Sequence, residues 1–421
     1  MSTANKPARP RRAIASSETA REINRDILLR TIHLHQPVSR ADLARLTGLQ
    51  PSTVSVIIGQ LIDEDWVLPG ELGRLPRGRR PTFVVLNDRH AALAIDLRPG
   101  RANLAAVDIN GKLLGRELVA YDLHAGSSAD EAKTAIARIA QVARKLRTAH
   151  GDRLFHGLGV SVSGRVEQKT HRLLFSPNVP WNQIDLYAEL SRELEMLIEM
   201  DNAANACLFS ERWFGNFSDV ANMLVVSVSE GIGAGLLIDG RVARGRDGMA
   251  GEFGHMALEP VSADAPVCGC GNTGCWETFA SNRAGLRYYH ELAPESELAS
   301  FQELIELAQA GDLRALRAID RMSVYLARGL ATLAAGLAPE AIIVVGDCTA
   351  LWPRIRPVLE SQLIARSFTP QTPRVAAAVD GDAARLRGAA AMVLLKTLFR
   401  STDFTLRLPR ADEQVADRES C

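Results

Sequence analysis

The segment AGEFGHMALEPVSADAPVCGCGNTGCWE, residues 250–277, holds the most specific pattern in the chain. Cys268, Cys270 and Cys275 lie close together in it, and His255 precedes them. Three thiolates and one imidazole complete a tetrahedral zinc shell, and the glycines between the cysteines allow a short loop to fold around one ion. The spacing therefore predicts one structural Zn2+ per chain, held by these four residues. The alternative is a group of reduced cysteines without a metal.

The charge is distributed unevenly along the 421 residues, although the whole chain has 49 basic and 49 acidic residues. Residues 1–90 contain 14 Lys and Arg but only nine Asp and Glu. A basic N-terminal segment followed by an acidic body predicts a nucleic-acid-binding module attached to a second part. The sequence has no apolar run of transmembrane length and no hydrophobic signal-peptide core. We therefore expect a cytoplasmic protein that does not bind membranes.

The N-terminal part of the chain has the pattern of a winged helix-turn-helix. Residues 1–18 lack apolar periodicity and predict a disordered basic arm, whereas residues 19–87 predict three short helices and a two-stranded wing. The expected helices are Glu22–His33, the segment from the Ser39 cap to Gly48, and Pro51–Asp65. The wing ends in the strand Thr82–Leu86. The side chains expected to face the interior include Leu43, Leu46, Val54, Ile58 and Leu61.

The third of these helices is the candidate recognition helix, whose polar face would enter the major groove. The residues on this face are Ser52, Thr53, Val56 and Gln60. None of them is basic, so we expect the wing to supply much of the electrostatic affinity. The arginines at the wing tip are Arg77, Arg79 and Arg80. They resemble the short arginine hooks that lie in narrow A/T minor grooves, and the alternative is a solvated basic loop.

The rest of the chain predicts an α/β body with two lobes, residues 88–205 and residues 206–400, followed by a tail, residues 401–421. Each lobe opens on strands with a hairpin signal, and the second is expected to begin with a strand over Met223–Ile238. This repetition is typical of the duplicated actin-like fold. The other elements expected are helices at Ser128–His150, Leu186–Glu193, Ala203–Phe214, Phe301–Ala310 and Leu313–Leu337, and a buried strand at Ala341–Val345.

Together these motifs resemble the ROK family, which includes both repressors and sugar kinases. The resemblance runs from the winged helix to Gly388-Ala389-Ala390 and implies a winged helix-turn-helix followed by a two-lobed actin-like ATPase fold. It also implies a set of residues that hold sugar hydroxyls, with His255 serving as a zinc ligand as well. These residues are Asn178, Asn202, Glu252, His255 and Glu277. The alternative for Asn178 is a turn residue before Pro180.

The same resemblance implies that phosphoryl transfer has been lost. Kinases of the family have an aspartate that deprotonates the attacking sugar hydroxyl; its position here is Ala203, and Asp201 is expected to point elsewhere. The three phosphate-binding loops have also changed, since they carry an arginine and a proline, a glutamate, and an aspartate. These loops are Asp96-Leu97-Arg98-Pro99-Gly100, Ser229-Glu230-Gly231 and Val345-Gly346-Asp347. Together the changes argue against an enzyme.

From these features we expect a repressor of carbohydrate-uptake or catabolic genes whose affinity for a double-stranded DNA operator is altered by a sugar. A homodimer or a tetramer would match a palindromic operator. One alternative is an ATP-dependent sugar kinase that also binds DNA, and Ala203 and Glu230 count against it. Another is a regulator controlled by a protein partner, and the retained Glu252, His255 and Glu277 count against that one.

Overall fold

The computed structural model describes residues 17–72, 82–124, 126–176, 180–217, 219–259, 265–367, 370–378 and 381–399. The expected tail and almost all of the expected N-terminal arm lie outside these residues. The chain forms two compact units, which divide between Asn87 and Asp88, and each is described separately. Among the described residues, no helix is both long enough and apolar enough to cross a membrane.

The first unit contains the three expected helices, α1 (Ser17–His35), α2 (Arg40–Thr47) and α3 (Pro51–Asp63). The side chain of Ser39 caps α2, because its hydroxyl oxygen accepts a hydrogen bond from Asp42 N at 3.1 Å. The helix ends at Gly48, whose φ of 70° lies in the left-handed region that favours glycine. Both expected caps are confirmed, and the turn from Gly48 to Gln50 separates α2 from α3.

The sheet of this unit has the antiparallel order β1-β3-β2. Its strands are β1 (Val38–Ser39), β2 (Val67–Leu72) and β3 (Thr82–Leu86). The hairpin β2-β3 is the expected wing, whereas β1 is too short to leave an alternating pattern in the sequence. The prediction for Leu46 was wrong, since 43% of this residue is exposed. Leu43 and Thr47 form the buried i, i+4 pair of α2, which leaves Leu46 on the solvent side.

The body contains two five-stranded sheets with the same topology, of order β10-β7-β4-β5-β6 and β13-β12-β11-β14-β15. In each sheet the first strand pairs antiparallel with the second and parallel with the fourth. The first sheet consists of β4 (His90–Arg98), β5 (Arg101–Asp108), β6 (Leu113–Ala120), β7 (Leu154–Val162) and β10 (Ile198–Asn202). The second consists of β11 (Met223–Val228), β12 (Ile232–Ile238), β13 (Arg241–Val242), β14 (Ala341–Val345) and β15 (Arg374–Ala377). The duplicated fold is therefore confirmed.

Two expectations for the second lobe had different outcomes. The single strand over Met223–Ile238 was wrong, because the chain reverses at Ser229-Glu230-Gly231 and forms the antiparallel pair β11-β12. The apolar run on both sides of this turn concealed the reversal. By contrast, helix α10 (Leu313–Leu337) and strand β14 (Ala341–Val345) have the expected bounds.

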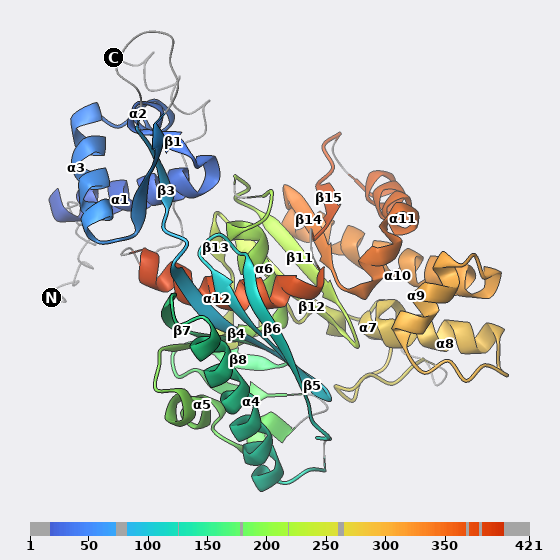
Figure 1. Ribbon diagram of the computed structural model, residues 1–421. Coiled ribbons are helices and arrows are strands. Elements are labelled where there is room, and N and C mark those ends of the chain that lie inside the picture. Colours follow the sequence, from blue (N-terminus) through green and yellow to red (C-terminus); the bar gives the residue numbers. More distant parts are fainter. Residues whose placement is uncertain are drawn as a thin grey trace, which may run out of the picture. The chain divides into compact units, whose positions relative to one another are not determined.

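Helices α6 (Ala203–Trp213) and α12 (Gly381–Leu398) form a layer that contacts both sheets. Although α12 follows β15 in the chain, it packs on β4, β7 and β10 of the first sheet (Figure 1). Helices α4 (Ala129–Ala149) and α5 (Leu186–Leu194) pack on other parts of the first sheet. The second sheet shares its core with α7 (Glu277–Ala280), α8 (Asn282–Leu292), α9 (Phe301–Gln309), α10 and α11 (Trp352–Ala365).

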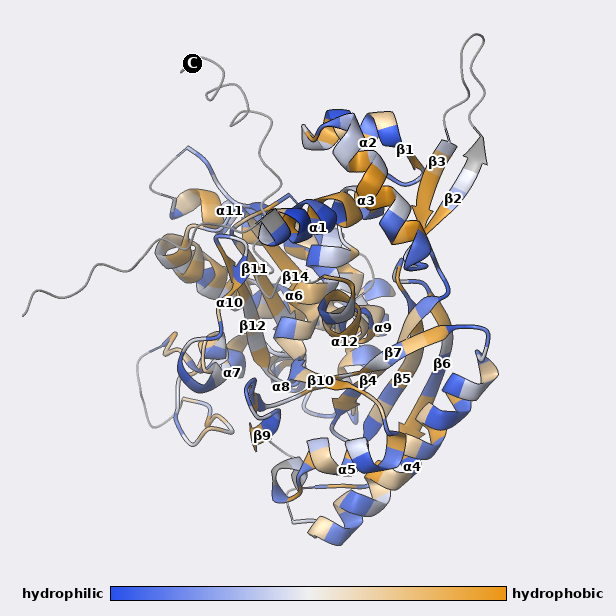
Figure 2. Cartoon of the chain, turned by 90° about the vertical axis from the view of Figure 1, so that its left-hand side faces the viewer, coloured by the Kyte–Doolittle hydropathy of each residue, from blue (hydrophilic) through white to orange (hydrophobic). Residues whose placement is uncertain are grey.

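Glycines allow the central helices to approach their neighbours closely. A Cβ atom at Gly159 of β7 would lie 1.8 Å from the carbonyl oxygen of Ala389 in α12. A Cβ atom at Gly388 of α12 would lie 1.7 Å from the carbonyl oxygen of Ala206 in α6. Only glycine fits at either position, so the backbone of α12 packs directly on β7 and on α6 in the centre of the body (Figure 2).

Candidate ligand pocket, metal centre and DNA interface

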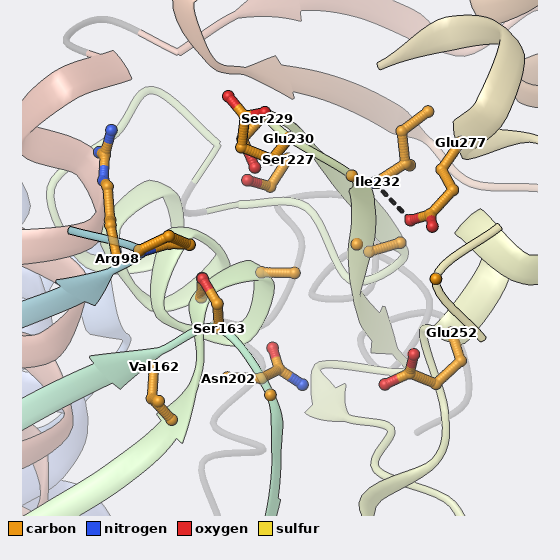
Figure 3. Close-up of a pocket in the computed structure, with 18 of the residues that line it drawn as sticks. Arg98, Val162, Ser163, Asn202, Ser227, Ser229, Glu230, Ile232, Glu252 and Glu277 are labelled. Carbon is orange, nitrogen blue, oxygen red and sulfur yellow. Dashed lines mark hydrogen bonds between the residues drawn. The ribbon is translucent and has the colours of Figure 1, made fainter. Parts of the chain in front are cut away.

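A pocket of about 450 Å³ lies between loops of the two lobes of the body. Its wall comes from the β4-β5 hairpin, the loop after β7, the start of α6, the β11-β12 turn and the segment 251–255 (Figure 3). This volume is typical of pockets that bind small molecules. The pocket brings together four of the five residues predicted to hold a sugar, namely Asn202, Glu252, His255 and Glu277.

Two glycines set the positions of Glu252 and His255. A Cβ atom at Gly251, where φ is 98°, would lie 2.0 Å from the carbonyl oxygen of Ala234. A Cβ atom at Gly254 would lie 2.1 Å from the carbonyl oxygen of Ile232. Both glycines therefore rest directly on the backbone of β12. The short 3-10 helix Glu252–His255, which follows Gly251 and contains Gly254, lines the pocket with its two polar side chains.

The four predicted metal ligands form one cluster, with all their ligand atoms within 4.8 Å of one another. His255 Nδ1 lies 3.4 Å from Cys268 Sγ, and Cys270 Sγ lies 3.8 Å from Cys275 Sγ. A tetrahedral ion with Zn–S bonds of about 2.3 Å would separate two sulfur ligands by about 3.8 Å. The donor set and its spacing therefore fit a tetrahedral divalent metal ion.

The cysteine loop is anchored to α10 through Trp276. This side chain is fully buried, and its Nε1 donates a hydrogen bond to the carbonyl oxygen of Tyr325 at 3.0 Å. Gly329 makes room for the indole, since a Cβ atom there would lie 2.0 Å from the ring. Burial raises the pKa of the Cys268 thiol. Metal binding by this thiol is therefore coupled to the release of its proton.

Glu277 connects the cluster to the pocket. Its Oε1 lies 2.9 Å from Cys268 Sγ, and its Oε2 accepts a hydrogen bond from Ile232 N at 3.3 Å. The other nitrogen of the His255 ring, Nε2, lies 3.6 Å from Glu252 Oε2. Because His255 Nδ1 faces the thiols, a metal ion bound there would leave Nε2 to carry the proton and to face Glu252.

Asn202 and Ala203 border the pocket at the start of α6. Asn202 caps the helix, since its Oδ1 accepts a hydrogen bond from Asn205 N at 2.8 Å. Asn202 can therefore donate hydrogen bonds to a ligand through its amide NH2 group. Ala203 adds only a methyl group to the pocket wall. Asp201 accepts hydrogen bonds from Arg244 Nη2 at 2.7 Å and from Asn205 Nδ2 at 2.9 Å, so the expectation that it points elsewhere is confirmed.

The three segments expected to be altered phosphate loops border the same pocket, through Arg98, Glu230 and Asp347. Glu230 Oε2 lies 3.2 Å from Arg283 Nε, and Asp347 Oδ2 accepts a hydrogen bond from Asn282 Nδ2 at 3.1 Å. Carboxylates in two of these loops would repel a triphosphate. In Figure 3, Asn202 and Glu252 lie in the lower part of the pocket, Glu230 lies in its upper part, and Arg98 lies on the left.

The predicted DNA-contacting face of α3 is accessible to solvent. Ser52 and Val56 are exposed, with 56% of Val56 accessible, and Thr53 and Gln60 are half-buried. The opposite face buries Val54, Ile57, Ile58 and Leu61. An exposed valine can contact the methyl group of a thymine, and Thr53 and Gln60 can form hydrogen bonds with base edges.

Some predicted residues are not placed, and other residues of the sites were missed. Asn178 and the wing arginines Arg77, Arg79 and Arg80 lie outside the described residues. Exposed Ser55 and half-buried Gly59 of α3 were not singled out from the sequence, although the i, i+3 and i+4 spacing from Ser52 and Val56 could have found them. The missed residues that line the pocket include Arg101, Phe175, Asn282 and Arg385.

Comparison with known protein families matches this chain to the ROK family over residues 92–396. The xylose repressor of Bacillus subtilis is 30% identical over 359 residues, which cover 85% of this chain and 90% of that protein. The DNA-binding transcriptional dual regulator NagC of Escherichia coli is 26% identical over 382 residues, which cover 87% of this chain and 91% of NagC. Both matches are longer than the body, residues 88–421, so they extend into the N-terminal unit.

Solved structures agree on the fold. A ROK family transcriptional regulator, a homologue of the E. coli Mlc protein, superposes with a TM-score of 0.72 at 24% identity and covers 92% of this chain and 98% of its own. A ROK family glucokinase from Streptomyces griseus, solved with glucose and AMPPNP, gives a TM-score of 0.64 at 27% identity and covers 72% of this chain and 98% of its own. Both the regulator and the kinase forms of the fold are therefore represented among similar proteins.

Proposed function

Because the chain belongs to the ROK family, we propose that it is a transcriptional repressor whose affinity for operator DNA is altered by a sugar bound in the body. This proposal rests mainly on the residues that line one pocket, which are Asn202, Glu252, His255 and Glu277 together with Ala203. Polar side chains suited to sugar hydroxyls are present, and the side chain needed as a base is absent. Similarity to the xylose and N-acetylglucosamine repressors over both units supports this function.

We propose that the sugar binds between the first residues of α6 and the segment Glu252–His255. The carboxylate of Glu252 would accept hydrogen bonds from hydroxyls, while the amide of Asn202 and the His255 ring would donate them. Glu277 would contribute its Oε1 beside the metal cluster. Asn178 is included from the sequence alone. This combination of donors and acceptors suits a sugar, whose hydroxyls both donate and accept hydrogen bonds.

We propose that the ion held by His255, Cys268, Cys270 and Cys275 is Zn2+ and that its role is structural. Three thiolates select a soft tetrahedral ion, and four protein ligands leave no open position for catalysis. When bound, zinc would fix the tautomer of His255 and hold its Nε2 toward the sugar. Metal binding and ligand recognition would therefore share one side chain.

The purified protein is expected to transfer no phosphate from ATP to any monosaccharide. A positioned general base contributes roughly 10²–10⁴-fold to such a reaction, and Ala203 provides none. The variant Ala203→Asp alone is expected to stay inactive, because Glu230 and Asp347 still border the site where phosphates would bind. Coupled assays for ADP release over a sugar panel would measure both. A wild-type rate well above background would instead support the ATP-dependent sugar kinase.

Operator binding is expected to divide between the wing and α3. The double variant Arg77→Ala/Arg79→Ala should weaken binding and flatten its salt dependence, by roughly 0.9 in logarithmic slope for each DNA phosphate that is no longer neutralised. Thr53→Ala or Gln60→Ala should change base preference in the major groove and leave that slope nearly unchanged. Fluorescence anisotropy over a salt series would measure both effects. If the double variant kept the wild-type affinity and slope, the wing would be only a solvated loop.

A dimer, or a tetramer built from dimers, is the proposed DNA-binding form. The single recognition helix proposed for each chain would contact only a short DNA half-site. Two chains related by two-fold symmetry would contact the two half-sites of a palindromic operator. Light scattering with and without operator DNA would test this assembly. A chain that bound its operator as a monomer would contradict it.

A further inference from the structure

We propose that the effector is a neutral disaccharide, whose first ring binds near Glu252 and whose second ring binds in a second subsite of the same pocket. This inference rests on the proposed function and names the chemical class of its ligand. The second subsite consists of residues that line the pocket at the turn between β11 and β12, at the start of α8 and after β14. These residues are Ser229, Glu230, Asn282, Arg283 and Asp347.

The second subsite lies apart from the residues proposed to hold the first ring. Asn202 and Glu252 are in the lower part of the pocket, whereas Ser229 and Glu230 are in its upper part (Figure 3). The pocket that contains both parts has a volume of about 450 Å³, within the range of about 300–1,000 Å³ for pockets that bind drug-sized molecules. A single sugar ring is smaller than such molecules. One ring near Glu252 therefore leaves the upper part of the pocket for a second ring.

Hydrogen bonds and an ion pair hold the three segments of the second subsite together. The backbone N–H of Asn282 donates a hydrogen bond to the carbonyl oxygen of Ser229 at 2.8 Å. The side-chain Nδ2 of Asn282 donates a hydrogen bond to Asp347 Oδ2 at 3.1 Å. Arg283 Nε, on the next residue of α8, lies 3.2 Å from Glu230 Oε2. Segments that are far apart in the chain therefore form one polar wall of the pocket.

Asn282 is the residue of this wall that requires a further hydrogen bond. Only 2% of it is exposed, and its Oδ1 has no hydrogen-bond partner among the described residues. The orientation of its amide follows from Asp347, because the reverse orientation would place Oδ1 against a carboxylate and bring two acceptors together. A buried polar atom without a partner is destabilising. Since Asn282 lines the pocket, a hydroxyl of the second ring would donate the missing hydrogen bond.

The charges of the pocket favour a neutral ligand. Four arginines and four carboxylates are among the described residues that line it. In the second subsite, the carboxylates of Glu230 and Asp347 accompany a single arginine, Arg283. A phosphate placed there would face two carboxylates, whereas sugar hydroxyls can donate hydrogen bonds to carboxylates and accept them from arginine. The second subsite therefore fits a sugar ring better than the phosphates of a nucleotide.

The test compares monosaccharides with disaccharides of the same unit on the full-length protein, by titration calorimetry. The sets are glucose with maltose and cellobiose, xylose with xylobiose, and N-acetylglucosamine with diacetylchitobiose. At least one disaccharide is expected to bind about tenfold more tightly than its own monosaccharide, or better. Adenosine and ATP are titrated as well. If either bound more tightly than every disaccharide, the second subsite would be a nucleotide site and the proposal would fail.

The variant Asn282→Ala is expected to remove the preference for the disaccharide, because it loses the acceptor proposed for the second ring. Asn282 is buried, so the melting temperature of this variant is measured first. Arg283→Ala is a second variant that should reduce the same preference and keep the fold, because the Arg283 side chain is 54% exposed. Its matched control is Arg314→Ala, which breaks a similar exposed ion pair, with Glu295, away from the pocket. This control should keep the preference.

Equal affinities for monosaccharides and disaccharides would overturn the proposal. A disaccharide preference that survives in either Asn282→Ala or Arg283→Ala, once the variant is shown to be folded, would overturn it too. In both cases a monosaccharide that changed operator binding would still support the proposed function. If no sugar bound or changed operator binding, both would fail.

Discussion

Cys275→Ser is expected to yield protein without bound metal and with a melting temperature lowered by at least about 5 °C. Cys275 is one of four proposed ligands whose donor atoms lie within 4.8 Å of one another, and a hydroxyl is a poor substitute for a thiolate on a soft ion. Structural zinc contributes several kcal/mol to folding, and about 1 kcal/mol moves the midpoint of a large domain by roughly 2–4 °C. Elemental analysis and calorimetry would measure the two quantities.

The control for this variant is Cys421→Ser, which removes a thiol that stands alone in the sequence. It should retain one metal ion per chain and the melting temperature of the wild type. Wild-type protein purified without chelator that contained no metal would contradict the assignment. It would leave the alternative of reduced cysteines, in which Cys275→Ser has only a small effect.

His255→Ala is expected to lose both the metal ion and the sugar, whereas Glu252→Ala should lose the sugar alone. His255 Nδ1 faces the thiols while its Nε2 lies 3.6 Å from Glu252 Oε2, so one ring would serve both proposed sites. Glu252 lines the pocket but has no part in the metal cluster. Deleting a hydrogen bond to a charged group should weaken sugar binding roughly 10–100-fold.

Calorimetric titration of sugar and elemental analysis, both on the same preparations, would separate the two effects. Glu277→Ala would separate the two effects less well. Glu277 also accepts a hydrogen bond from Ile232 N, so its loss would disturb the start of β12. An unchanged sugar affinity in Glu252→Ala would move the sugar away from the segment 251–255. Loss of metal in Glu252→Ala would show instead that the two sites cannot be separated.

Local sequence patterns predicted the structure correctly where it depends on a single helix or strand. The Ser39 cap, the Gly48 stop and the long periodic helix Leu313–Leu337 all form as expected. Leu46 was misplaced because α2 has only two turns, and the choice of its buried face depends on α3 and the sheet. Strand β1 has two residues, too few for any periodicity.

Long-range packing explains what the sequence did not predict. Helix α12 returns to the first sheet after the second sheet is complete, and no local pattern in its sequence specifies that partner. It brings Arg385 close to Asp96 and to the hairpin that holds Arg98 and Arg101. Arg385 is far from the other three residues in the chain, so the cluster that they form is visible only in three dimensions. The cysteine cluster was predicted because its ligands are close in the chain and zinc chemistry restricts their spacing.

The measurement that tests the central claim most directly is operator binding with and without a sugar. Genomic fragments selected by the purified protein would provide the operator, and anisotropy would then give its affinity over a panel of neutral and anionic sugars at fixed salt. We expect specific binding that at least one sugar changes tenfold or more, with no ATP consumed, and no such change in Glu252→Ala. Specific DNA binding that no sugar alters, or sugar phosphorylation in place of DNA release, would contradict the account.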